Sequence, residues 1–220
     1  MSSARRILTV LIPASSLIFF SSLLVSSTFY YSSKQVKLND AVISSLQSPN
    51  DNPRGYPIAC AGTAISAMLF LPAAAFFFRT LVRGNRIVAT AGSLIYTLGL
   101  IAALLIGCLA PFPRLYGHVH IPLAYAAFIA IATGLLICLA LASYPLVRKG
   151  GTSGIAMLPL VLILLVVVLY LFYLVLAPDD HAPDHGLLNN VAFVEWTLSV
   201  CIALYTAILT VVLSGWRLLE

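Results

Sequence analysis

Charged residues are scarce in this chain: Asp, Glu, Lys and Arg together make up 9% of its 220 residues. A soluble domain carries about 25% of these residues, and a nucleic-acid-binding protein needs a basic soluble surface. The low charge therefore excludes both classes. Hydrophobic residues make up 61% of the sequence and the mean hydropathy is +1.03, values typical of an integral membrane protein.

Six apolar runs are long enough to cross a bilayer, because about 20 apolar residues span the hydrocarbon core as a helix. Isolated strands cannot satisfy their backbone in lipid, and the runs lack strand-like alternation. The sequence predicts an all-α, polytopic bundle of six transmembrane helices that forms a single domain over residues 1–220. The predicted spans are about 7–29, 57–78, 87–110, 119–144, 155–177 and 191–214.

Basic residues are unevenly divided between the two sides of the predicted bundle. The side that holds both termini has 8 of the 12, and the other side has 4. Cytoplasmic loops carry the excess of Lys and Arg, so both termini are predicted to be cytoplasmic, in the cell membrane. The larger group is Arg5, Arg6, Arg79, Arg83, Arg86, Arg148, Lys149 and Arg217, and the smaller group is Lys34, Lys37, Arg54 and Arg114.

Acidic residues and histidines gather on the opposite, outer side. All four histidines and five of the seven acidic residues fall in predicted outer loops. Polar chemistry is therefore expected at the outer face. These residues are Asp40, Asp51, Asp179, Asp180, Asp184, His118, His120, His181 and His185.

Glu195 is the acidic residue that falls inside a predicted span, about five residues from its start. An ionisable group in hydrocarbon is costly, so it marks a functional site or an internal partner. Two interpretations stay open. Glu195 either fastens its helix to a neighbour through hydrogen bonds, or acts as a proton carrier, head-group acceptor or general acid/base. The adjacent Trp196 is typical of an interfacial anchor.

The longest predicted outer loop, residues 30–56, contains a dense run of turn-forming residues from Ser48 to Gly55. It is predicted to form an ordered cap. Within it, residues 38–47 have helical spacing of apolar positions and could form a short amphipathic helix on the outer surface. This arrangement would place Asp40 and Arg54 over the mouth of the bundle.

The last outer loop holds five potential metal ligands within residues 179–185. His181 and His185 have the spacing of one helical face, but Pro178 and Pro183 argue against a continuous helix. The Glu of an HExxH motif is also absent. A solvated acidic turn is favoured over a bound cation, and no cofactor is predicted. The weaker metal candidates are Asp180, His181, Asp184 and His185.

Several short motifs resemble a six-span membrane family. The first lie before the second span: Ile43-Ser44 and Asn52-Pro53-Arg54-Gly55. His118 opens an Ala-rich fourth span, and Phe193-Val194-Glu195-Trp196 opens the last. These residues, in this layout, resemble the family that includes the damage-regulated autophagy modulators, and a related bacterial and archaeal family with no assigned function.

Two departures make the second family the closer match. The Gly-containing turn expected after Ile43-Ser44 is replaced by Leu46-Gln47-Ser48, and the Pro-Glu pair of the autophagy members is absent. The resemblance implies a role in lipid organisation or trafficking. It also favours His118 over His120 as a ligand-binding residue, although either could be an interfacial imidazole.

Two functions remain open from the sequence. The favoured one is a non-enzymatic multi-pass protein that binds lipid or a membrane protein subunit through its bundle and outer polar face, because no catalytic constellation is complete. The alternative is a small membrane enzyme or transporter that acts on a lipid head group or small solute around Glu195 and His118. Membrane lipids are the expected partners and nucleic acid is not. The candidate ligand-binding residues are Glu195, His118, Asp40, Arg54 and Trp196.

Overall fold

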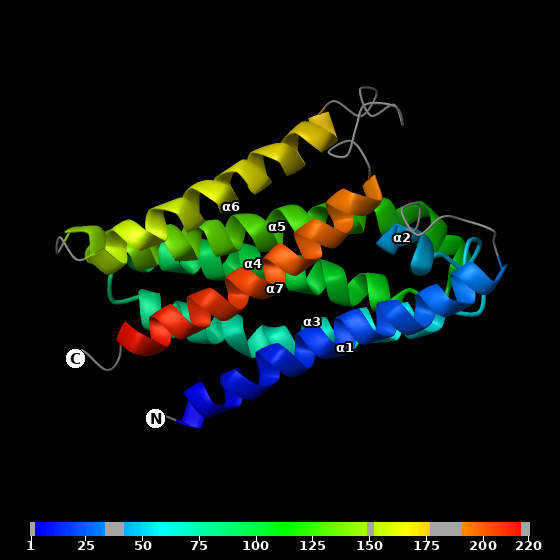
Figure 1. Cartoon of the computed structure of the whole chain (residues 1–220), viewed down its shortest axis with the longest axis horizontal. Helices are drawn as coiled ribbons and strands as arrows, with labels where there is room; N and C mark the ends of the chain where they lie inside the picture. Colours follow the sequence, from blue (N-terminus) through cyan, green and yellow to red (C-terminus); the bar gives the residue numbers. More distant parts are fainter. Residues whose placement is uncertain (1–2, 34–41, 149–151, 177–190, 217–220) are drawn as a thin grey trace.

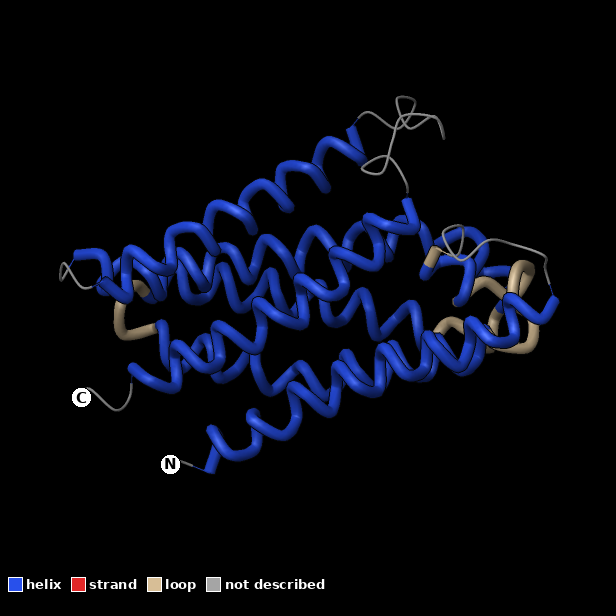
Figure 2. Tube along the Cα trace, in the orientation of Figure 1, coloured by secondary structure: helices blue, strands red, loops and turns tan. Residues whose placement is uncertain are grey.

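A computed structural model of the chain describes residues 3–33, 42–148, 152–176 and 191–216. These residues form helices joined by turns and loops, and no strand occurs among them (Figure 2). The helices are α1 Ser3–Ser33, α2 Ile43–Leu46, α3 Tyr56–Leu81, α4 Arg86–Cys108, α5 Pro113–Arg148, α6 Thr152–Leu176 and α7 Val191–Trp216.

The predicted all-α membrane bundle is confirmed, but the predicted count of six spans is not. Five helices of the described part are long and apolar enough to cross a membrane: α1, α3, α4, α5 and α7. α6 matches the predicted span 155–177, yet its apolar described segment, Leu158–Phe172, is shorter. The whole of α6 has 25 residues and extends about 37 Å, which exceeds the hydrocarbon thickness of about 30 Å.

The long helices run along a common axis (Figure 1). The start of α1 and the end of α7 lie at the same end of the bundle, and α2 lies at the opposite end. We call residues 42–55, which include α2, the cap, and the end that carries them the cap end. α6 follows α5 along the bundle and diverges from the other helices toward the cap end (Figure 1).

The helices approach closely where their facing residues are small. A Cβ added at Gly134 of α5 would lie 2.5 Å from the backbone nitrogen of Tyr96 in α4. Small residues allow such backbone contact between helices in lipid. The backbones of α4 and α5 are therefore in direct contact at this point.

Hydroxyl groups join α1 to α3 inside the bundle. The Ser15 hydroxyl donates to the backbone oxygen of Ser66 at 2.9 Å, and the Ser66 hydroxyl donates to the backbone oxygen of Ser15 at 3.0 Å. Both side chains are buried. The pair satisfies its own polar atoms, which is required of buried hydroxyls away from water.

The cap is held by one buried amide. Asn52 Nδ2 donates to the backbone oxygen of Ser26 at 3.0 Å and lies 2.9 Å from its hydroxyl, while Asn52 Oδ1 accepts from the Gly55 N–H at 3.1 Å. Asn52 is 1% exposed. These bonds join the cap to α1 and to the start of α3.

α2 is shorter than the helix predicted over residues 38–47, of which 38–41 lie outside the described residues. It ends at Leu46, shortly before Pro49, because a proline disfavours the helical conformation of the residue before it. Ile43 and Leu46 are buried. The apolar side of α2 therefore packs into the bundle.

Candidate functional site

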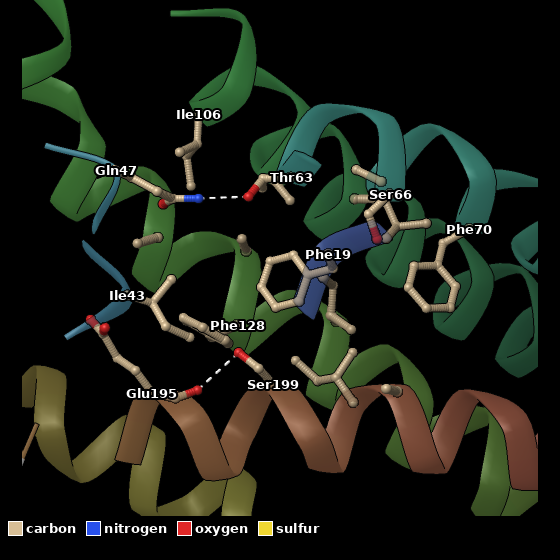
Figure 3. Close-up of a pocket in the computed structure, with 18 of the residues that line it drawn as sticks. Phe19, Ile43, Gln47, Thr63, Ser66, Phe70, Ile106, Phe128, Glu195 and Ser199 are labelled. Carbon is tan, nitrogen blue, oxygen red and sulfur yellow. Dashed lines mark hydrogen bonds between the residues drawn. The ribbon is translucent and has the colours of Figure 1, made fainter. Parts of the chain in front are cut away.

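A cavity of about 110 Å³ lies among α1, α3, α4, α5 and α7, and α2 with Gln47 covers it from the cap end. Most of its lining is apolar, with aromatic rings from three helices: Phe19 of α1, Phe70 of α3 and Phe128 of α5 (Figure 3). Mostly apolar cavities with a few converging polar groups are typical small-molecule sites. The polar groups of this one are concentrated near the cap.

Glu195 is the acidic side chain of the cavity. It is the fifth residue of α7, is half-buried, and its Oε2 accepts a hydrogen bond of 3.1 Å from the Ser44 backbone N–H. The Ser199 hydroxyl donates to the Glu195 backbone oxygen at 2.9 Å (Figure 3). The carboxyl group thus links α7 to the cap, as the fastening interpretation requires, and Glu195 is also part of the cavity lining, as the functional one requires.

Gln47 and Thr63 form a second polar contact in the lining (Figure 3). Gln47 Nε2 donates to the Thr63 hydroxyl at 2.6 Å, and that hydroxyl donates to the Ala59 backbone oxygen at 2.9 Å. Both side chains are buried. Through these two hydrogen bonds the Gln47 amide of the cap is connected to the backbone of α3. This donor is therefore satisfied within the protein.

His120 is the titratable group of α5 in the lining. Its ring stacks on Tyr116 with centroids 4.9 Å apart, and its Nδ1 lies 3.2 Å from the Tyr116 backbone oxygen. A carbonyl oxygen only accepts, so Nδ1 carries the proton and Nε2 of the neutral ring is an acceptor. Burial raises the pKa of the Tyr116 hydroxyl, which keeps this stacking partner uncharged.

Of the sequence-predicted site residues that the structure describes, one lines the cavity and three do not. Glu195 lines the cavity, whereas His118 is exposed and lies outside its described lining. His120 lines the cavity instead of His118, because residues two apart on a helix point roughly 200° apart. Arg54 is exposed on the cap, and Trp196 is half-buried against the apolar cluster under the cap.

The remaining predicted residues lie outside the described part of the chain: Asp40, Asp180, His181, Asp184 and His185. Among residues that are described, no group of three or more His, Cys, Asp or Glu is placed to hold a metal ion. The described residues therefore offer the Glu195 cavity as the candidate site.

The sequence did not single out Gln47, Thr63 or Ser44 as site residues. One sequence feature could have marked Gln47 as a site residue: it directly follows an apolar helical pattern. A polar residue at such a position faces either water or a buried partner. Its burial depends on how the cap packs against α3. Contacts of this kind join segments distant in sequence and leave no local pattern.

Replacing Glu195 tests the link between α7 and the cap. We expect Glu195→Gln to stay within about 0.5 kcal/mol of wild-type stability, because the amide oxygen can still accept from Ser44. Glu195→Leu leaves that N–H without its acceptor and should cost about 1–3 kcal/mol. Thermal unfolding in detergent measures both variants. Equal stability of the Leu variant and wild type would show that the bond contributes nothing.

Comparison with known proteins gives one match. A family model described as "Protein of unknown function (DUF998)" matches residues 13–212. No curated protein and no solved structure matches the chain. The match agrees with the resemblance to a bacterial and archaeal family of unassigned function, and it does not support the autophagy modulators in particular.

Proposed function

The chain belongs to the DUF998 family, whose function is unknown, and we propose that it binds a lipid-like amphiphile inside its helical bundle without chemical conversion. The observation that carries this proposal is the cavity, which combines a polar end with a long apolar wall. Membrane lipids are the partners that such a cavity meets in a bilayer.

The two ends of the lining match the two ends of an amphiphile. Ser44 and Gln47 belong to the cap, and Glu195 lies in the second turn of α7 next to it. Phe70 and Ile131 lie near the middle of their helices and line the apolar part. An amphiphile would place its head at the cap and its chain among the apolar residues, since each part then meets its own kind of surface.

The described lining supports binding better than catalysis. Its titratable side chains are Glu195 and His120, and each already holds a backbone group, Ser44 N–H and Tyr116 C=O. A catalytic site needs a nucleophile, a base and a stabilising group in mutual reach. The alternative of an enzyme or transporter that uses Glu195 with His118 loses support, because His118 is exposed away from the cavity.

Our proposal for the topology includes α6 as a sixth crossing. The start of α1 and the end of α7 share one end of the bundle (Figure 1), and a chain returns to the same side only after an even number of crossings. The basic residues Arg79, Arg83 and Arg86 flank the turn from α3 to α4 at this end. The positive-inside rule then assigns both termini to the cytoplasm of a cell membrane.

Filling the cavity should abolish binding. Ala203 of α7 lines the cavity, so Ala203→Phe introduces a ring into about 110 Å³ of space. We expect co-purified lipid, measured by native mass spectrometry, to fall at least about tenfold, which corresponds to a loss of about 1.4 kcal/mol in binding. Thermal stability of the empty variant verifies that it is folded.

Ala126→Phe is the matched control, because Ala126 is exposed on α5 and does not line the cavity. This variant should retain wild-type lipid. If the Ala203 variant is folded and retains as much lipid as the control, the cavity is not the binding site and the proposed function is wrong.

A further inference from the structure

The polar end of the cavity has one acidic side chain and, among the described residues, no fixed positive charge. Glu195 is the acidic residue of the lining, and no Lys or Arg occurs among the described residues that line it. A ligand phosphate or carboxylate would find no Lys or Arg to neutralise its charge in a medium of low dielectric constant, where an unpaired charge is costly. The charge pattern therefore disfavours anionic head groups.

Hydrogen-bond donors near the cap are directed into the protein. Gln47 Nε2 donates to Thr63, and the Ser199 hydroxyl donates to the Glu195 backbone oxygen. His120 holds the Tyr116 backbone oxygen through Nδ1. These three donors are satisfied by protein acceptors, so they do not require a ligand.

Acceptors remain in excess at the same place. A carboxylate offers about four lone-pair sites, and hydrogen bonds from the Ser44 backbone N–H, the Ser44 hydroxyl and the Ile43 backbone use three of them. His120 adds Nε2 as an acceptor when Nδ1 carries the proton. A buried acceptor without a donor costs free energy, so a ligand that donates hydrogen bonds is complementary to this end.

The volume limits how much of a ligand enters. A cavity of about 150 Å³ holds one benzene molecule, and this cavity measures about 110 Å³. It has room for a small head group and the first few carbons of one chain. A phosphodiester head with two acyl chains does not fit within it.

We infer that the ligand is a single-chain amphiphile with a small hydrogen-bond-donating head, a hydroxyl or an amine, that the Glu195 carboxyl group accepts. This inference rests on the proposed function and specifies its ligand class. The head lies against Glu195 and His120 under the cap, and the chain extends along the aromatic side of Phe19 and Phe128.

The test compares three ligands with the same alkyl chain: tetradecanol, tetradecylamine and tetradecanoate. Each is titrated into the full chain in nanodiscs of zwitterionic phosphatidylcholine, and binding is measured by native mass spectrometry and by the shift in melting temperature. The proteins are wild type, Glu195→Gln, Ala203→Phe and the control Asp51→Asn, which removes an acidic group of the cap that does not line the cavity.

We expect wild type to bind the alcohol and the amine at least about tenfold more tightly than the carboxylate, since one hydrogen bond to a charged group contributes about 1.5–3 kcal/mol. Glu195→Gln should lose about tenfold in affinity for the amine and less for the alcohol, because its amide oxygen still accepts. Asp51→Asn should match wild type for all three ligands.

The outcomes separate the two proposals. If the carboxylate binds as tightly as the alcohol and Ala203→Phe removes both, the ligand class is wrong and the binding function stands. The class is also wrong if Glu195→Gln binds the amine like wild type. If wild type binds none of the three ligands, the ligand class is wrong, and if it binds them equally well with the cavity filled, the binding function itself is overturned.

Discussion

Gly134→Ala should lower the melting temperature in detergent by about 6 °C, because the added methyl group overpacks the contact between α4 and α5. The new Cβ would lie 2.5 Å from the Tyr96 backbone nitrogen and 2.7 Å from its Cα. Backbone atoms cannot move aside as a side chain can, so α4 and α5 must separate. Overpacking costs about 1–3 kcal/mol, and about 2–4 °C per kcal/mol applies to a chain of this size.

Gly84→Ala is the matched control for this prediction. Gly84 lies in the turn between α3 and α4, and a Cβ there would meet its nearest atom, the Leu81 backbone oxygen, at 3.5 Å. This is an ordinary van der Waals contact, so the melting temperature should stay within about 2 °C of wild type. Equal losses in the two variants would contradict the close approach of α4 and α5.

Asn52→Ala should release the cap and cost about 3 kcal/mol, roughly 9 °C in melting temperature. The substitution removes the donor to Ser26 and Leu46 and the acceptor of the Gly55 N–H. Each buried group left without a partner costs about 1–3 kcal/mol. Hydrogen exchange of residues 42–55 should accelerate relative to the helices, and differential scanning calorimetry measures the loss of stability.

Asn85→Ala provides the comparison for the cap. Asn85 also accepts a backbone hydrogen bond, from Val88 at 3.1 Å, but it is exposed at the start of α4. Loss of an exposed helix cap costs about 1 kcal/mol, because water replaces the lost acceptor. The cap residues should exchange at wild-type rates in this variant. A loss as large as that of Asn52→Ala would show that burial of Asn52 is not the cause.

The helices could be predicted from the sequence because hydrocarbon imposes both their length and their composition. Each predicted span coincides with one long helix, but α1 and α5 extend beyond their predicted spans at both ends. α5 begins at Pro113 instead of residue 119, since proline is favourable in the first turn and a helix need not stop at the membrane boundary. The apolar pattern reflects the thickness of the hydrocarbon core, whereas the helix ends also depend on local backbone preferences.

The candidate site could be predicted in part. Glu195 is recognisable because a carboxyl group within an apolar run needs a partner. That partner, the Ser44 N–H, lies 151 residues away in sequence, so only the fold identifies it. The choice between His118 and His120 depends on how α5 is rotated about its axis, and the Ala-rich sequence of this helix has no polar stripe that would indicate the rotation.

The attachment of the cap on two sides affects how a molecule would reach the cavity. Asn52 fastens the cap to α1 and Glu195 fastens it to α7, so a molecule that enters through the cap has to break these hydrogen bonds, and one that enters between the helices from the lipid phase does not. Occupancy would then follow the mole fraction of the molecule dissolved in the membrane. Compounds of equal head group should rank by their oil–water partition coefficients.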